Sequence, residues 1–139
     1  KLQFVAPKKS EFGVDETSLK GKTIGAQRAT IAGQWLEENM GDVVDIRLYD
    51  TQENAYLDMN AERIDGVLAD AFVQYEWLQS EAGANFEFKG EPVFSNDKIG
   101  IAVRKDDPLR DRLNKALEEI VADGTYAEIN AKYFPFSIY

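Results

Sequence analysis

Residues 23–40 read TIGAQRATIAGQWLEENM and contain a strand, a tight turn and a helix in immediate succession. The first five of them, 23–27, form a short, partly apolar run that predicts a strand. From Thr30 onward the apolar residues recur at helical spacing, and Gly41 follows where a C-terminal cap belongs. A helix that starts directly after a strand is typical of α/β folds. The apolar face of this helix consists of Ile31, Trp35, Leu36 and Met40.

The same strand-and-helix unit recurs twice further along the chain. Residues 43–49 (VVDIRLY) predict a strand and 51–60 a helix, and 66–69 (GVLA) and 71–80 repeat the pattern. A further strand is predicted at 2–6 (LQFVA). Strands that alternate with helices over short connections imply a mostly parallel sheet with helices on both faces.

The C-terminal part of the chain has a different pattern. Residues 86–88 predict irregular β structure, and 99–104 (IGIAVR) predict a strand. Asp106, Asp107 and Pro108 form a helix start, because Asp can cap a helix and Pro suits its first turn. A last short helix is predicted over 126–133. The helix after Pro108 carries an apolar stripe of Leu109, Leu113, Ala116, Leu117, Ile120 and Val121.

The composition excludes several kinds of function. The 139 residues, 44% of them apolar, fit one water-soluble globular domain. A net charge of −9 repels phosphate backbones and anionic lipids, so nucleic acid and membrane surfaces are poor partners. Cysteine and histidine are absent, which excludes disulfides, thiol nucleophiles and triads built on histidine. No pattern predicts a metal, a cofactor or a catalytic pair.

Neither a membrane-spanning segment nor a leader peptide is evident. No apolar run reaches the length needed to cross a bilayer, and Lys1 begins directly on a strand-like run. We therefore expect that a leader peptide has been removed or that the chain starts late.

Two turns of the predicted sheet carry residues that suit ligand binding. Ligands of open parallel sheets bind beyond the carboxyl ends of the strands, which here are Gln27, Tyr49 and Ala69. After the first strand, free N–H groups at the helix start and the Thr30 hydroxyl suit a carboxylate. After the third, Asp70 could accept a hydrogen bond from an ammonium group. Each could instead be an ordinary helix cap. Together they suit the zwitterionic head of an α-amino acid.

Three long motifs resemble the family 3 periplasmic solute-binding proteins for polar amino acids, of the lysine/arginine/ornithine- or histidine-binding type. They are LKGKTIGAQRATIAGQWLEEN (19–39), YDTQENAYLDMNAERIDGVLAD (49–70) and IGIAVRKDDPLRDRLNKALEEIVADGTYAEINAKYF (99–134). The motifs cover nearly the whole chain and keep the order and the approximate spacing of the family.

The resemblance implies a two-lobed α/β protein of the periplasmic-binding-protein type II fold, from which the N-terminal half of lobe one is missing. Residues 1–104 would form lobe two with its hinge strands, 2–6 and 99–104. Residues 105–139 would be C-terminal helices that pack on lobe one. The implied function is to deliver a polar amino acid, with a basic one favoured, to an ABC importer in the membrane. Such a protein is periplasmic or extracytoplasmic, is no enzyme and needs no cofactor.

The resemblance also assigns roles to individual residues. Thr30 and the N–H of Ile31 correspond to the carboxylate contacts, Asp70 to the acceptor of the α-ammonium, and Gln27 to a position that lines the side-chain pocket. The chain departs from the family at 28–30 (Arg-Ala-Thr), where members often have Gly-Ser/Thr-Thr, and at Ala32, which replaces a polar residue. These departures affect the identity of the ligand more than the mode of binding.

Two other functions stay open at this point. The same fold supports cyclohexadienyl dehydratase-like enzymes, and it also occurs as the ligand-binding domain of membrane sensors. The apolar stripe after Pro108 would normally pack against the missing half-lobe. We therefore expect a homodimer, a domain swap, or helices folded back onto lobe two.

Overall fold

The computed structural model describes residues 1–96 and 98–139 of the chain. The chain divides into two compact units, Lys1–Asp97 and Lys98–Tyr139, and each is described by itself. The division falls close to residue 104, where the sequence predicts that the helices of lobe one begin. The assignment of the two parts to lobes stays a prediction.

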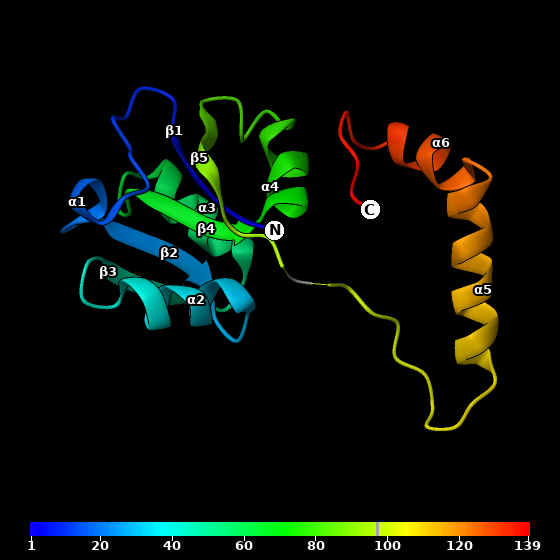
Figure 1. Ribbon diagram of the computed structural model, residues 1–139. Helices are drawn as coiled ribbons and strands as arrows, with labels where there is room; N and C mark the ends of the chain where they lie inside the picture. The colour runs from blue at the N-terminus through cyan, green and yellow to red at the C-terminus, as the bar shows by residue number, and fades with distance from the viewer. Residues whose placement is uncertain (97) are drawn as a thin grey trace. The chain divides into compact units, whose positions relative to one another are not determined.

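The first unit is built on a five-stranded sheet with the strand order β3-β2-β4-β1-β5 (Figure 1). Strand β2 pairs in parallel with β3 and β4, whereas β1 pairs antiparallel with β4 and β5. Only β1 among these five strands therefore runs against the others, and the predicted mostly parallel sheet is confirmed. The strands are β1 Leu2–Pro7, β2 Thr23–Gln27, β3 Asp45–Tyr49, β4 Gly66–Asp70 and β5 Phe86–Phe94.

Helices cover both faces of the sheet, because neighbouring residues of a strand point to opposite sides. Phe4 and Leu68 pack with the first two helices of the unit on one face, whereas Val5 and Val67 pack with the other two on the opposite face. All four of these side chains are fully buried, which stabilises the fold by roughly 1.5–3 kcal/mol for each. The helices are α1 Glu16–Leu19, α2 Ile31–Met40, α3 Gln52–Asn60 and α4 Ala71–Leu78.

A side chain caps each helix that follows a parallel strand. Thr30 Oγ1 accepts a hydrogen bond from the Gly33 N–H (3.3 Å), and Thr51 Oγ1 accepts one from the Asn54 N–H (3.2 Å). Asp70 caps α4 in the same way. These caps satisfy N–H groups that have no partner within the helix, and so allow each helix to begin within a few residues of its strand.

The second unit contains two helices, α5 Leu109–Ala122 and α6 Thr125–Ala131, as the sequence predicts. Gly124 separates them with a φ of +87°, a conformation that glycine adopts without strain. No helix among the described residues is both long and apolar enough to cross a membrane.

The predicted strand at 99–104 is wrong, since these residues form neither strand nor helix. Ile99 and Ile101 are 89% and 66% exposed. A β-strand is stable only when a neighbour satisfies its backbone groups. The described residues of the second unit include no other strand with which this segment could pair.

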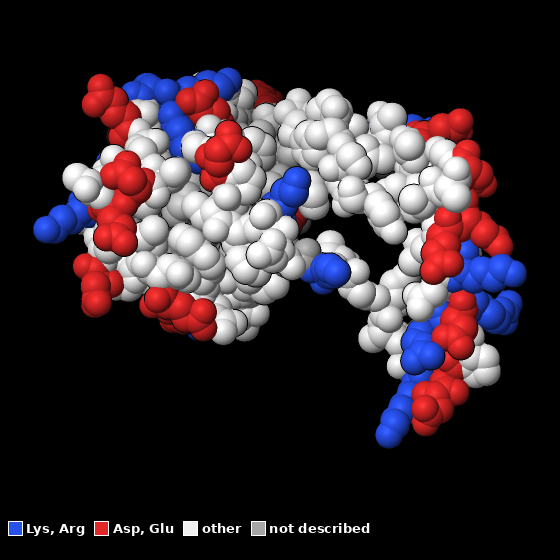
Figure 2. Space-filling view, viewed as in Figure 1, with Lys and Arg blue, Asp and Glu red and all other residues white. Residues whose placement is uncertain are grey.

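The apolar stripe of α5 is only partly covered within its own unit, where Leu113, Ile120 and Val121 are half-buried. No residue of α5 is buried, and Leu109 and Leu117 are exposed. Figure 2 shows the charged side chains of this unit gathered along one side of α5 and uncharged ones on the other. The helix is therefore amphipathic, as predicted, and its own unit leaves Leu109 and Leu117 on the apolar side uncovered.

Candidate functional site

The carboxyl ends of three parallel strands lie at one edge of the sheet. Gln27, the last residue of β2, pairs with Tyr49, the last residue of β3, and β4 ends at Asp70 on the other side of β2. Helices α2, α3 and α4 therefore begin at this edge, and the arrowheads of β2 and β4 point to it in Figure 1. The predicted site residues are thus brought together at one edge.

The start of α2 offers backbone donors rather than a free hydroxyl. The Thr30 hydroxyl donates to the Gln27 carbonyl oxygen (2.6 Å) and accepts from the Gly33 N–H, so it acts as a helix cap. Among the described residues, no group accepts a hydrogen bond from the N–H of Ile31 or of Ala32. These two N–H groups and the positive end of the helix dipole make the position favourable for an anion.

The Asp70 carboxylate uses its two oxygens differently. Oδ1 accepts from the N–H groups of Phe72 (3.0 Å) and Val73 (3.4 Å), which caps α4. Oδ2 forms an ion pair with the N-terminal ammonium of Lys1 (3.2 Å). The side chain of Asp70 is 31% exposed. Asp70 is therefore a cap that still presents one carboxylate oxygen to a nitrogen donor.

Gln27 and its neighbour Arg28 lie over the end of β3. Gln27 Nε2 donates to the Asp50 carbonyl oxygen (3.2 Å), while Arg28 Nε pairs with Asp50 Oδ1 (2.9 Å) and Arg28 Nη2 donates to the Leu48 carbonyl oxygen (3.2 Å). Both charged side chains of this ion pair are mostly exposed, so it adds only about 0–1 kcal/mol to stability. Sequence reasoning missed Asp50, although it directly follows a parallel strand.

The charges at this edge suit a small zwitterion. The anion-favouring start of α2 follows β2, and Asp70 ends the neighbouring strand β4. Paired strands are roughly 4.8 Å apart. A carboxylate at the first position and an ammonium at the second would each meet a group of opposite polarity.

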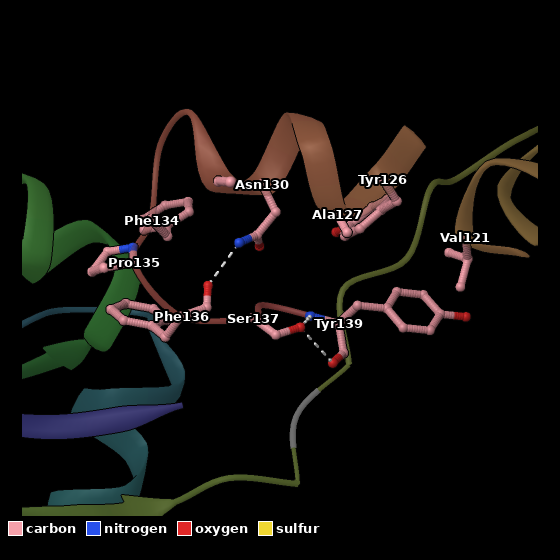
Figure 3. A pocket seen from close by; sticks show the side chains of 10 residues that line it. Val121, Tyr126, Ala127, Asn130, Phe134, Pro135, Phe136, Ser137 and Tyr139 are labelled. Carbon is pink, nitrogen blue, oxygen red and sulfur yellow. Dashed lines mark hydrogen bonds between the residues drawn. The ribbon is translucent and has the colours of Figure 1, made fainter. Parts of the chain in front are cut away.

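The second unit contains a pocket of about 440 Å³ that includes none of these residues. Figure 3 shows the chain after α6 turning back beneath the helix, where Asn130 holds it. Asn130 Nδ2 donates to the Phe136 carbonyl oxygen (2.7 Å), and Asn130 Oδ1 accepts from the Ile138 N–H (3.0 Å). Aromatic rings line much of the pocket, including Tyr126, Phe134 and Tyr139. The part of the chain described by the structure contains no cluster of metal-ligating side chains.

The fold and this edge together define a class of protein. An open α/β sheet binds small ligands at the carboxyl ends of its strands, and here strand β1 starts, and β5 ends, at that same edge, where Leu2 pairs with Phe94. This architecture is that of the type II periplasmic-binding-protein fold. The chain belongs to the bacterial extracellular solute-binding proteins, family 3, whose sequence profile matches residues 3–136.

Named relatives agree with this assignment. The chain is 38% identical to the ABC transporter arginine-binding protein 1 of Escherichia coli over 84% of its length, and 34% identical to the histidine-binding periplasmic protein of Salmonella typhimurium over 99%. Among solved structures, an ancestral arginine-binding protein bound to arginine matches 96% of the chain, with 31% identity and a TM-score of 0.80.

The chain covers only part of the length of these relatives. The chain spans 49% of the arginine-binding relative, 55% of the histidine-binding relative and 59% of the ancestral protein. The chain therefore corresponds to about half of the length of the proteins it resembles, as the sequence predicts for a fragment.

Proposed function

We propose that this chain forms part of an extracytoplasmic amino-acid-binding protein, which delivers a polar amino acid to the permease of an ABC importer. A basic amino acid is favoured, because the relatives named above are arginine- and histidine-binding proteins and a further one is lysine/arginine/ornithine-binding. The single observation that carries the proposal is the anion-favouring start of α2 beside the carboxylate of Asp70.

Each end of the ligand has its own partner in this proposal. The N–H groups of Ile31 and Ala32 receive the ligand carboxylate, with Thr30 holding the turn, and Asp70 Oδ2 accepts from the α-ammonium. Gln27 borders the ligand side chain. Hydrogen bonds to charged groups contribute about 1.5–3 kcal/mol each, so the two contacts could support weak binding by this lobe alone.

No chemical reaction is part of the proposal. The named relatives are binding proteins, and the proposed role of Asp70 is to cap α4 and to accept a hydrogen bond, with no proton transferred. A dehydratase of the same fold would use a carboxyl group as general acid or base. A turnover assay with prephenate or arogenate that gave product would contradict the proposal.

The exposed apolar side chains of α5 favour packing against another protein surface. We expect it to pack against the part that the longer relatives possess and this chain lacks, or against a second copy when the chain is alone. Light scattering of the isolated chain should therefore report a dimer, and Leu109→Glu combined with Leu117→Glu should yield a monomer. A monomer before substitution, with both leucines accessible, would contradict the dimer.

The binding proposal is tested by titrating the chain with single amino acids and following backbone amide signals by NMR. L-Arginine, L-lysine and L-histidine should shift the amides of Ile31, Ala32 and Phe72 at millimolar concentration, whereas 5-guanidinopentanoate, which lacks the α-ammonium, should bind more weakly. If no amino acid shifts these amides, or if the shifts lie elsewhere, the proposed site is wrong.

A further inference from the structure

Gln74 is a buried polar residue that the site described so far does not use. It lies on α4, four residues after Asp70, and its side chain is 0% exposed. The side-chain nitrogen Nε2 donates to the carbonyl oxygens of Gln3 (2.6 Å) and Ala69 (3.1 Å). One side-chain amide therefore links helix α4 to strands β1 and β4.

The two carbonyl groups that accept from Gln74 lie next to Asp70 in the sheet. Gln3 and Ala69 face each other across the antiparallel pair of β1 and β4, and the next pair toward the edge is Leu2 with Asp70. Gln74 thus binds the backbone directly before Asp70 and fastens it to β1. Because both partners are acceptors, only the NH₂ group of Gln74 can face them.

Burial of this side-chain amide costs free energy, so packing alone does not account for a glutamine here. Within the described residues, Gln74 Oε1 is buried without a hydrogen-bond partner. An unpartnered buried polar atom destabilises a fold, whereas an apolar side chain of similar size would avoid it. The two donated hydrogen bonds are therefore the reason for a glutamine at this position.

We propose that Gln74 is a positioning residue for ligand binding, which fixes the Asp70 carboxylate at the sheet edge. This inference rests on the proposed function, in which Asp70 accepts from the α-ammonium. Cap bonds from Phe72 and Val73 hold Oδ1, and Gln74 holds the backbone that precedes the carboxylate. Without Gln74 the carboxylate keeps its cap bonds but loses part of the support that fixes its direction.

The test compares two ligands that differ only in the α-ammonium. Gln74→Met removes both donors at similar side-chain size. It should weaken L-arginine binding by about tenfold, as expected for the loss of a well-placed charged hydrogen bond, and leave 5-guanidinopentanoate binding nearly unchanged. The control is Val67→Ala, which removes buried methyl groups from β4, the strand that ends at Asp70, and leaves these hydrogen bonds in place. This variant should weaken the binding of both ligands equally, or the binding of neither.

A second measurement decides the inference without any ligand. Amide hydrogen exchange at Phe72 and Val73 should accelerate more in Gln74→Met than in Val67→Ala, because the α4 cap loosens locally. Equal exchange in the two variants, or equal weakening of both ligands by Gln74→Met, would overturn the positioning role. If Gln74→Met does not fold, the exchange of the Gln74 side-chain NH₂ protons in the unmodified chain decides: slow exchange supports the two hydrogen bonds, and fast exchange overturns them.

The two proposals fail in different ways. If the unmodified chain binds L-arginine and 5-guanidinopentanoate with equal affinity, Asp70 does not bind the α-ammonium. The role of Asp70 in the proposed function is then wrong. The exchange data would then still show whether Gln74 orders the start of α4.

Discussion

Replacing Asp70 with asparagine separates its two roles, because the two oxygens of the carboxylate have different partners. Asparagine is as good a helix cap as aspartate, so its Oδ1 can keep the bonds from Phe72 and Val73. Its Nδ2, however, replaces the oxygen that faces the nitrogen donor. A ligand ammonium would then meet a donor instead of an acceptor.

The expected magnitudes follow from these contacts. Loss of a hydrogen bond between charged groups costs about 1.5–3 kcal/mol, which corresponds to roughly 10- to 150-fold in affinity for L-arginine. The free energy of unfolding should fall by less than about 1 kcal/mol, since the cap remains and the contact with Lys1 is partly exposed. Asp70→Ala should weaken L-arginine binding at least as much, and it should cost about 1 kcal/mol of stability because the cap is lost as well.

Two assays check this prediction together. Calorimetry or NMR titration measures the affinity of each variant, and urea unfolding measures its stability. An Asp70→Asn variant that binds L-arginine as the unmodified chain does would refute the reasoning. So would a variant that loses several kcal/mol of stability, because the cap would then not have been preserved.

Other predictions concern the fold around the site. Burial against Trp77 raises the pKa of Tyr56 from 10.0 to about 12. Between pH 10 and 12 the Tyr56 hydroxyl is therefore ionised in the unfolded chain but not in the folded protein. The free energy of unfolding should be constant with respect to this group below pH 10 and should fall between pH 10 and 12. Tyr56→Phe should reduce this fall, to which the raised pKa of Tyr49 also contributes, and a stability profile with an unchanged slope would contradict the role of Tyr56. Ala29 has a φ of +56°, so Ala29→Gly should raise the free energy of unfolding by about 1 kcal/mol in urea titrations. No gain would mean that the turn is unstrained.

Much of the first unit could be predicted because local and global signals agree. Thr30 and Asp70 stand where an apolar strand ends and helical spacing begins, and the structure finds both as caps at the sheet edge. The predicted strand at 99–104 failed because alternation shows only that a segment could pair, and pairing depends on a neighbour elsewhere in the chain.

Contacts between distant residues were out of reach of sequence reasoning. Gln74 lies in AFVQYEWL (71–78), where it and Glu76 are polar residues among apolar and aromatic ones, a pattern that predicts exposure of both. Only the tertiary structure brings its amide to the carbonyl of Gln3, 71 positions away. The pair of Arg28 with Asp50 was missed for the same reason, since two adjacent strands must meet before these side chains do.

The place of β1 in the sheet has a consequence for synthesis. Its residues come first in this chain, yet its neighbours are β4 and β5, whose last residue is Phe94. At about 5–20 residues per second, the ribosome reaches the end of β4 in roughly 3 to 13 s and the end of β5 in roughly 4 to 17 s. During the first of these intervals Phe4 and Val5 lack Leu68 and Val67, the β4 residues with which they pair, so an apolar segment of the nascent chain must avoid misfolding until these partners emerge.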